Sequence, residues 1–203
     1  MTRDIGQKPM AARFEHLLKV IGSQRFLTMQ GNNNEVPFFI CDYQPAEAVD
    51  MTKLQKQLVN RIGQSGVRVL EINLYDLSIE LIKRRGLWER IQEVEPTVNK
   101  EELKEMLQNI LDPEAHLVPE IGLRLEAAEY DVLFLTGVGE VFPYIRSHNV
   151  LNNLQKVAKL KPTVMFFPGG YTHTLESGTA LVLFNRLQDD KYYRAYNIYD
   201  YQV

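Results

Sequence analysis

The stretch from residue 36 to residue 73, VPFFICDYQPAEAVDMTKLQKQLVNRIGQSGVRVLEIN, decides the fold. It begins with a short apolar and aromatic run, Val36–Cys41, which is typical of a strand buried on both faces. Apolar residues at helical spacing follow between Asp50 and Ile62, and residues 67–73 form a second strand-like run. A strand, a helix and a strand joined by short links form a βαβ unit, so we expect two parallel strands and a right-handed crossover.

Further buried strands lie downstream of this unit. Val132–Leu135 and Thr163–Phe167 have the same apolar character, and another strand is expected at about residues 194–198. The residues between the second and third strands, about 87–128, have helical patterning and predict a helical insertion. The sequence therefore predicts an α/β three-layer sandwich with a mostly parallel central sheet of about five strands, in one domain over residues 1–203.

Residues typical of helix caps occur within the predicted helical insertion and just before it. Asn99 and Glu102 have the spacing of a capping box, although Asn replaces the usual Ser or Thr. Asp112 followed by Pro113 predicts an N-cap with proline in the first turn. Gly86 follows a run of basic residues, where a left-handed glycine ends a helix.

Composition and charge exclude several classes of protein. The 23 Lys and Arg residues against 26 Asp and Glu residues give a formal net charge of −3, so a large basic field for nucleic acid is not expected, and DNA contact would be indirect. Cys41 is the only cysteine, which rules out an internal disulfide and fits a reducing compartment. Neither a signal peptide nor a membrane-spanning run is recognisable, so we expect a cytoplasmic protein without a membrane partner.

Ligands of open parallel sheets bind beyond the carboxyl ends of the strands. The residues expected at this edge are Asp42, Tyr43, Asn73, Tyr75, Asp76, Thr136, Gly137, Gly139, Pro168, Gly169 and Tyr171. A phosphate-binding loop needs glycines, a lysine and a hydroxyl, whereas residues 42–47 contain none of these and carry two acids. The sequence therefore predicts a topology resembling a P-loop NTPase without its phosphate-binding loop.

Two glycine motifs have both a structural and a functional interpretation. Gly137 and Gly139 resemble the start of a dinucleotide fingerprint, but Phe142 stands at the third glycine position, and a tight turn is favoured. Pro168, Gly169 and Gly170 are interpreted as a flexible loop that ends the fourth strand.

Catalytic and metal-binding patterns are not recognisable. The four histidines have no zinc-ligand spacing, and Cys41 at the end of a buried strand is interpreted as a packing residue. Asp42 and Asp76 each follow what we take to be neighbouring strands, so an acid pair that acts with a divalent metal is one interpretation, and capping of helices and turns is the favoured one. We predict no catalytic, cofactor-binding or metal-binding residues.

The polar run at residues 146–154 leaves two interpretations open. Its polar residues either cap a helix whose apolar residues pack inward, or they form a surface for a partner or an anionic ligand. That surface would consist of Arg146, His148, Asn152 and Asn153. The aromatic residues Tyr192, Tyr193 and Tyr196 form a second candidate partner surface.

Several strings together resemble a known family. They are residues 34–40, the motif Asp42-Tyr43-x-Pro45, and residues 70–77, 135–143, 146–154, 167–169 and 190–195. This combination is similar to the BrxB family of the BREX bacteriophage-exclusion systems, and the likeness extends from Phe14 to Ile198, with residues 171–179 as the main departure.

The resemblance implies a role in antiviral defence beside a methyltransferase, a large ATPase and the alkaline-phosphatase-like protein PglZ. It implies no enzymatic activity and no cofactor. We therefore expect a non-catalytic adapter that binds other BREX proteins, with PglZ or the large ATPase as the first partner. The alternative is a sensor of a nucleotide or phosphorylated ligand at the sheet edge, built on the loops of Gly137 and Gly169 with Arg146.

Overall fold

A computed structural model describes residues 5–29, 37–174, 178–188 and 195–203 of the chain, and these residues contain a seven-stranded mixed sheet. Its strands are β1 (Phe38–Tyr43), β2 (Val69–Asn73), β3 (Val132–Thr136), β4 (Thr163–Thr174), β5 (Gly178–Leu183), β6 (Leu187–Gln188) and β7 (Tyr196–Asn197). The order β2-β3-β4-β1-β7 is parallel throughout. β5 pairs antiparallel with the end of β4, and β6 pairs with β5.

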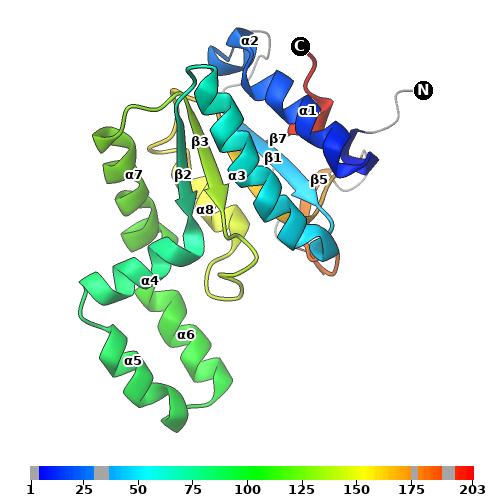
Figure 1. Ribbon diagram of the computed structural model, residues 1–203. Coiled ribbons are helices and arrows are strands. Elements are labelled where there is room, and N and C mark those ends of the chain that lie inside the picture. The colour runs from blue at the N-terminus through cyan, green and yellow to red at the C-terminus, as the bar shows by residue number, and fades with distance from the viewer. Residues whose placement is uncertain (1–4, 30–36, 175–177, 189–194) are drawn as a thin grey trace.

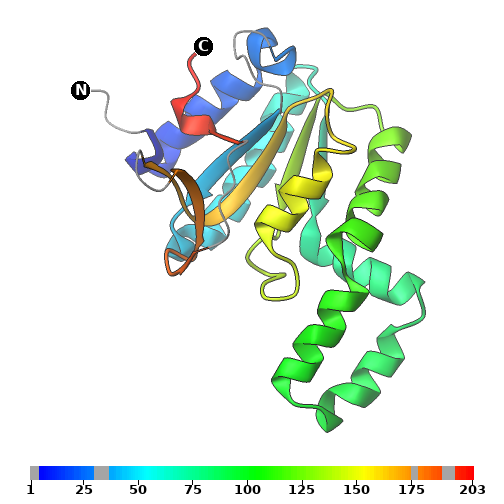
Figure 2. The same cartoon turned by 180° about the vertical axis from the view of Figure 1, so that it is seen from behind.

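Helices cover both faces of the sheet. In chain order they are η1 (Ile5–Gln7), α1 (Met10–Ile21), α2 (Gln24–Leu27), η2 (Pro45–Glu47), α3 (Ala48–Gln64), α4 (Leu74–Arg84), α5 (Trp88–Val94), η3 (Glu95–Thr97), α6 (Lys100–Ile110), η4 (Pro113–Leu117), α7 (Val118–Ala127), α8 (Ser147–Leu154) and η5 (Ile198–Asp200). α1 and α3 lie on one face (Figure 1), and α7 and α8 lie on the other (Figure 2).

The alternation of side chains along the strands divides the interior into two cores. Phe38 and Ile40 of β1 pack into the core formed with α4, α7 and α8, whereas Phe39 and Cys41 pack into the core formed with α1 and α3. Every one of these four side chains is 3% exposed or less. A strand buried on both faces must be apolar at successive positions, which explains the run at residues 38–41. The three-layer α/β sandwich is confirmed.

The two strands of the opening βαβ unit are parallel, as expected, but they are not neighbours. β4 and β3 lie between β1 and β2. The apolar pattern fixes where a strand lies in the chain, and it does not specify which distant strand pairs with it. The interpretation of Asp42 and Asp76 as an acid pair at the ends of neighbouring strands is therefore wrong.

The glycines after the fourth apolar run do not form a flexible loop, and that prediction is wrong. β4 continues without a break through Gly169 and Gly170 into an antiparallel hairpin with β5. Gly169 has a φ of 155°, and a Cβ atom there would lie 2.1 Å from the carbonyl oxygen of Val182. The glycine is needed because the β5 backbone approaches this closely.

The helix ends predicted from the sequence are confirmed. Asn99 and Glu102 form the capping box of α6. Asp112 accepts a hydrogen bond from the Ala115 N–H at 2.7 Å and caps η4, while Gly86 has a φ of 66°. The helix after β3 begins at Ser147, because turns and bends occupy residues 137–146.

The predicted helical insertion has two different parts. α7 packs on the sheet, and its residues Ile121 and Leu125 are buried. Residues 87–111, here called the arm, contain α5 and α6 and project away from the sheet (Figure 1). The Arg85 guanidinium donates to the carbonyl oxygen of Ile110 at 2.6 Å, which holds the two ends of the arm together.

Candidate functional site

A pocket of about 660 Å³ lies at the carboxyl ends of the parallel strands, between α3 and α4. We call it the edge pocket. Of the residues that the sequence placed at this edge, it brings together Tyr43, Asn73, Asp76, Thr136, Gly137, Gly139 and Pro168. The edge at which the sequence placed any ligand site therefore has a pocket, and ligand binding there stays a prediction.

Four residues expected at the edge do not line the pocket: Asp42, Tyr75, Gly169 and Tyr171. Asp42 lies within β1, where its carboxylate accepts hydrogen bonds from the Tyr171 N–H at 3.1 Å and from the Asn197 side chain at 3.0 Å. These bonds join β1 to β4 and β7. The role that the structure gives Asp42 is to hold three strands in register.

The turn after β3 packs against the cap of α4. The Asn73 Oδ1 atom accepts hydrogen bonds from the Tyr75 and Asp76 N–H groups at 2.9 and 3.2 Å. Gly137 has a φ of 70°, and a Cβ atom there would lie 2.2 Å from this Oδ1 atom. The favoured interpretation of this motif as a tight turn is confirmed.

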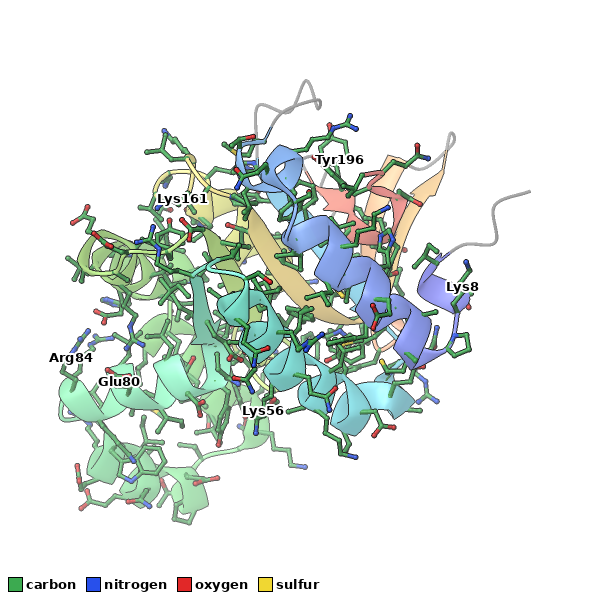
Figure 3. The ribbon with its side chains drawn as sticks, turned by 45° about the horizontal axis from the view of Figure 1, so that its top comes forward. Lys8, Lys56, Glu80, Arg84, Lys161 and Tyr196 are labelled. Carbon is green, nitrogen blue, oxygen red and sulfur yellow. The ribbon has the colours of Figure 1, made fainter. Side chains whose placement is uncertain are left out.

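The charged residues of the edge pocket are mainly acidic. Glu71, Asp76 and Glu140 line it together with Lys56 and Arg124. The Glu71 carboxylate accepts a hydrogen bond from the Thr136 hydroxyl at 3.2 Å. Lys56 is exposed on α3 (Figure 3), and it forms no ion pair with another described residue. The pocket thus offers one cation that is available to an anionic ligand, facing three carboxylates.

The second cation of the pocket belongs to a network of salt bridges. Arg124 donates to Glu80 at 2.7 Å and to Glu120 at 3.4 Å. Glu120 also accepts from Arg84 at 2.5 Å, and this hydrogen bond is the main cause of its lowered pKa. Glu80 and Arg84 lie on α4 (Figure 3), so the network fastens α7 to α4. Arg124 therefore has a structural role at the pocket wall.

The loop between β1 and α3 is closed by an ion pair. The Glu47 carboxylate accepts a hydrogen bond from the Gln44 N–H at 3.1 Å and another from Arg13 at 2.5 Å. Only 3% of the Arg13 side chain is exposed. Burial alone would lower the Arg13 pKa, but the hydrogen bond to Glu47 acts against it and the pKa is raised. The half-buried Glu47 of the loop is therefore paired with a buried, charged Arg13 on α1.

Cys41 packs in the core, in agreement with its interpretation from the sequence. It is completely buried, and its Sγ atom lies 3.3 Å from the Tyr199 hydroxyl. Burial raises its pKa to about 12, so the thiol stays protonated at neutral pH. Burial likewise raises the pKa of Tyr43 to about 12. Within the described residues, no cluster of three or more His, Cys, Asp and Glu side chains is placed to hold a metal ion.

The candidate surface at the start of α8 is only partly formed. Arg146 and Asn152 are exposed, but His148 is 7% exposed and cannot contribute to an open surface, so its inclusion is corrected. Asn153 donates from its side chain to the Asn149 carbonyl at 3.0 Å. The apolar residues of α8 pack inward as expected, although its N-cap residue Arg146 makes no side-chain capping hydrogen bond. That the polar face of α8 binds a partner or an anionic ligand stays a prediction.

Arg146 instead lines a second pocket, of about 360 Å³, between the arm, the start of α8 and the β5–β6 hairpin. Lys104 and Arg186 are the other charged residues of its lining. Tyr192 and Tyr193 lie outside the described residues. Tyr196 lies in β7 at the edge of the sheet and is 46% exposed (Figure 3).

Sequence reasoning missed the residues that helices contribute to the edge pocket, notably Lys56 and Arg124. Lys56 is one of two exposed lysines on α3, and only the packing of α3 beside α4 distinguishes it from Lys53. Glu71 was also missed, because it lies within β2 and not after it.

None of the helices in the described ranges is long and apolar enough to cross a membrane.

Comparison with known proteins identifies the family. The family model described as "BREX protein BrxB" matches residues 70–198. A "BREX protein BrxB" of Bacillus cereus (strain H3081.97) is 33% identical over 195 residues, which are 93% of this chain and 96% of that protein. A "BREX protein BrxB" of Escherichia coli O9:H4 (strain HS) is 30% identical over 186 residues, and this alignment covers 92% of this chain and 90% of that protein. No solved structure matches the chain. From the family model and from relatives that align over nine-tenths of its length, we conclude that the chain belongs to the BrxB family of BREX proteins.

Proposed function

We propose that this chain is a non-catalytic adapter of a BREX bacteriophage-defence complex. It would bind PglZ first, with the large BREX ATPase or the methyltransferase as further partners. Family membership supports the BREX assignment. The observation that carries the adapter role is the ion pair between Arg13 of α1 and Glu47 in the loop between β1 and α3.

In the P-loop-like layout that we infer, this loop corresponds to the strand–loop–helix position that binds phosphate in a P-loop NTPase. There, backbone N–H groups, a lysine and the start of a helix favour a phosphate. Here the Glu47 carboxylate accepts hydrogen bonds from the Gln44 N–H and from the buried Arg13 side chain. A phosphate in this position would meet a carboxylate that is already paired with Arg13. We infer a P-loop-like layout in which an internal ion pair replaces the phosphate.

The edge pocket supports the same proposal. A nucleotide carries several negative charges, and enzymes that act on it surround them with cations or metal ions. The three carboxylates of the pocket outnumber its two cations, and Arg124 is already paired with Glu80. Electrostatics therefore disfavour a nucleotide at this site.

Co-purification tests the adapter role. The tagged full chain is co-expressed with PglZ, the large ATPase and the methyltransferase of its own BREX system. We expect at least PglZ to co-elute at a fixed ratio in size-exclusion chromatography with light scattering. If the chain elutes alone in every combination at low and physiological salt, the adapter role is contradicted.

A sensor of a nucleotide or phosphorylated ligand is the second candidate. It is favoured by the size of the edge pocket and by Lys56, which reaches it without an ion-pair partner among the described residues. Calorimetry with ATP, GTP and NAD on the full chain decides between the two. The adapter proposal expects no binding up to millimolar ligand. Binding that Lys56→Ala abolishes and Lys53→Ala leaves intact would establish the sensor, since Lys53 is on the same helix but pairs with Asp50.

A further inference from the structure

The two helices of the arm are weakly buried. None of the residues of α5 or α6 is fully buried, although α6 carries apolar residues at helical spacing. Leu103 and Leu107 on α6 and Ile91 on α5 are half-buried. Figures 1 and 2 show the two helices side by side, away from the sheet. An amphipathic pair with half-covered apolar residues leaves part of its apolar surface available to another molecule.

A groove of about 280 Å³ lies between the arm, α4 and the turn after β3. We call it the arm groove. Ile91, Leu103 and Leu107 form its walls, and Ile79 and Ile82 of α4 form its base. Because these residues come from three different helices, the groove exists only when the arm is docked on α4.

The arm groove suits an apolar side chain better than a small-molecule ligand. Its volume is just below the roughly 300–1,000 Å³ of small-molecule sites, and such sites add well-placed polar groups. The Ser78 hydroxyl in its lining already donates to the Leu74 carbonyl at 2.6 Å. One or two bulky side chains from another protein would fill this space.

The charge around the arm groove specifies the partner further. The charged residues in its lining are Glu95 and Glu140, and both are exposed. The arm as a whole has six acidic and three basic residues, so it accounts for the entire formal net charge of −3 of the chain. A partner with basic residues beside its apolar side chains would be attracted to this surface and held in one orientation.

We propose that the arm groove binds an amphipathic, basic helix of another protein, with its apolar side chains in the groove and its Lys or Arg residues beside Glu95 and Glu140. An apolar helix face in a groove is a recurrent mode of peptide recognition. The proposal rests on the adapter function and specifies its partner chemistry.

Trp88 makes binding directly measurable. It is the only tryptophan of the chain, it lines the arm groove, and it is half-buried. The probes are two tryptophan-free helical peptides with the same leucine face, one with lysines and one with glutamates on the polar face. Titrated into the full chain, the Leu/Lys peptide should shift the Trp88 emission saturably, with an affinity at least tenfold higher than that of the Leu/Glu peptide.

Matched variants distinguish binding in the arm groove from non-specific electrostatic binding to an acidic protein. Leu103→Glu should weaken Leu/Lys binding at least tenfold. Met106→Glu, on the same helix and also half-buried but not lining the groove, should leave binding nearly unchanged. Neutralising Glu95 and Glu140 to Gln should weaken binding about fivefold more than neutralising the exposed arm residues Glu93 and Glu105. Equal effects in either comparison, or an unmoved Trp88 emission, overturn the proposal.

Two further outcomes separate the groove from the adapter role. If PglZ or another BREX protein co-purifies with the wild-type chain and equally well with Leu103→Glu, the groove proposal fails while the adapter stands. If no BREX protein co-purifies, the adapter proposal fails whatever the peptide titrations show.

Sedimentation of the chain alone tests whether a second copy of the chain occupies the arm groove. A dimer that Leu103→Glu dissociates would overturn the proposal of a basic helix.

Discussion

At the scale of single residues, Gly137 is held by two constraints. Its φ of 70° disfavours other residues, and an added Cβ atom would lie 2.2 Å from the Asn73 Oδ1 atom that caps α4. We expect Gly137→Ala to lower the free energy of unfolding by about 2–4 kcal/mol, from backbone strain and a displaced cap. Urea denaturation measures this.

A second glycine provides the control for this prediction. Gly63 lies in α3, and a Cβ atom there would meet nothing within 4 Å. Gly63→Ala should leave stability unchanged or raise it by up to about 1 kcal/mol. If both substitutions changed the free energy of unfolding equally, the close approach of Gly137 to Asn73 would not contribute to stability.

Asp131 makes stability depend on pH. Hydrogen bonds from the Arg68 side chain and N–H lower its pKa from 3.8 to about 2. Because the folded-state pKa is the lower one, the carboxylate stabilises the protein above about pH 4, and this contribution is lost as the pH falls through about 2. Allowing for solvent screening, we expect Asp131→Asn to cost about 1 kcal/mol at pH 7.

Denaturation of the wild type and of Asp131→Asn between pH 7 and pH 2 tests this dependence. The difference between their free energies of unfolding should shrink below about pH 4. Glu129→Gln is the control, because Glu129 pairs with the same Arg68 but its side chain is 89% exposed. Its effect should be near zero at every pH. A constant difference for Asp131→Asn would contradict the assignment.

At the scale of secondary-structure elements, α6 depends on its capping box. The Asn99 Oδ1 atom accepts hydrogen bonds from the N–H groups of Glu101 and Glu102 at 2.9 and 3.0 Å. Asn99→Ala should cost about 1 kcal/mol in helix stability. Asn109→Ala, at an exposed position inside the same helix, should cost nothing. Protease sensitivity of the arm measures the difference, and equal sensitivity of the two variants would contradict it.

The same element shows what the sequence can predict. The capping box and the N-cap at Asp112 are local, since each depends on side chains within three or four residues, and both were predicted. β4 was predicted to end at Phe167 because its glycines favour a loop when taken alone. The reason for Gly169 is the carbonyl oxygen of Val182 on another strand, which local sequence does not reveal.

In the candidate site, too, the features that depend on local sequence were predicted and those that depend on distant segments were not. Residues that end strands, such as Asn73 and Gly137, could be placed at the edge pocket because parallel strands share a carboxyl edge. Lys56 could not, since it depends on where α3 lies relative to α4. The arm groove was missed for a similar reason, because its walls and base come from separate helices that meet only in the tertiary structure.

At the scale of the whole molecule, the buried apolar residues and the net negative charge lie in different parts of the chain. The sheet and the helices on it hold two apolar cores. The acidic and basic residues outside residues 87–111 balance, and the excess of acidic residues lies in the arm. A surface with weak burial and strong charge is well suited to association steered by electrostatics.

This distribution predicts two levels of stability in one chain. β3 is buried at every position, whereas α6 has no fully buried residue. Amide hydrogens of β3 should exchange only through global unfolding, and those of residues 103–110 through local opening of the arm, at least ~100-fold faster. Hydrogen exchange followed by mass spectrometry measures both. A partner helix in the arm groove should slow exchange in residues 103–110 and leave β3 unchanged. Equal exchange rates in the free chain would mean that the arm and the sheet unfold as one unit.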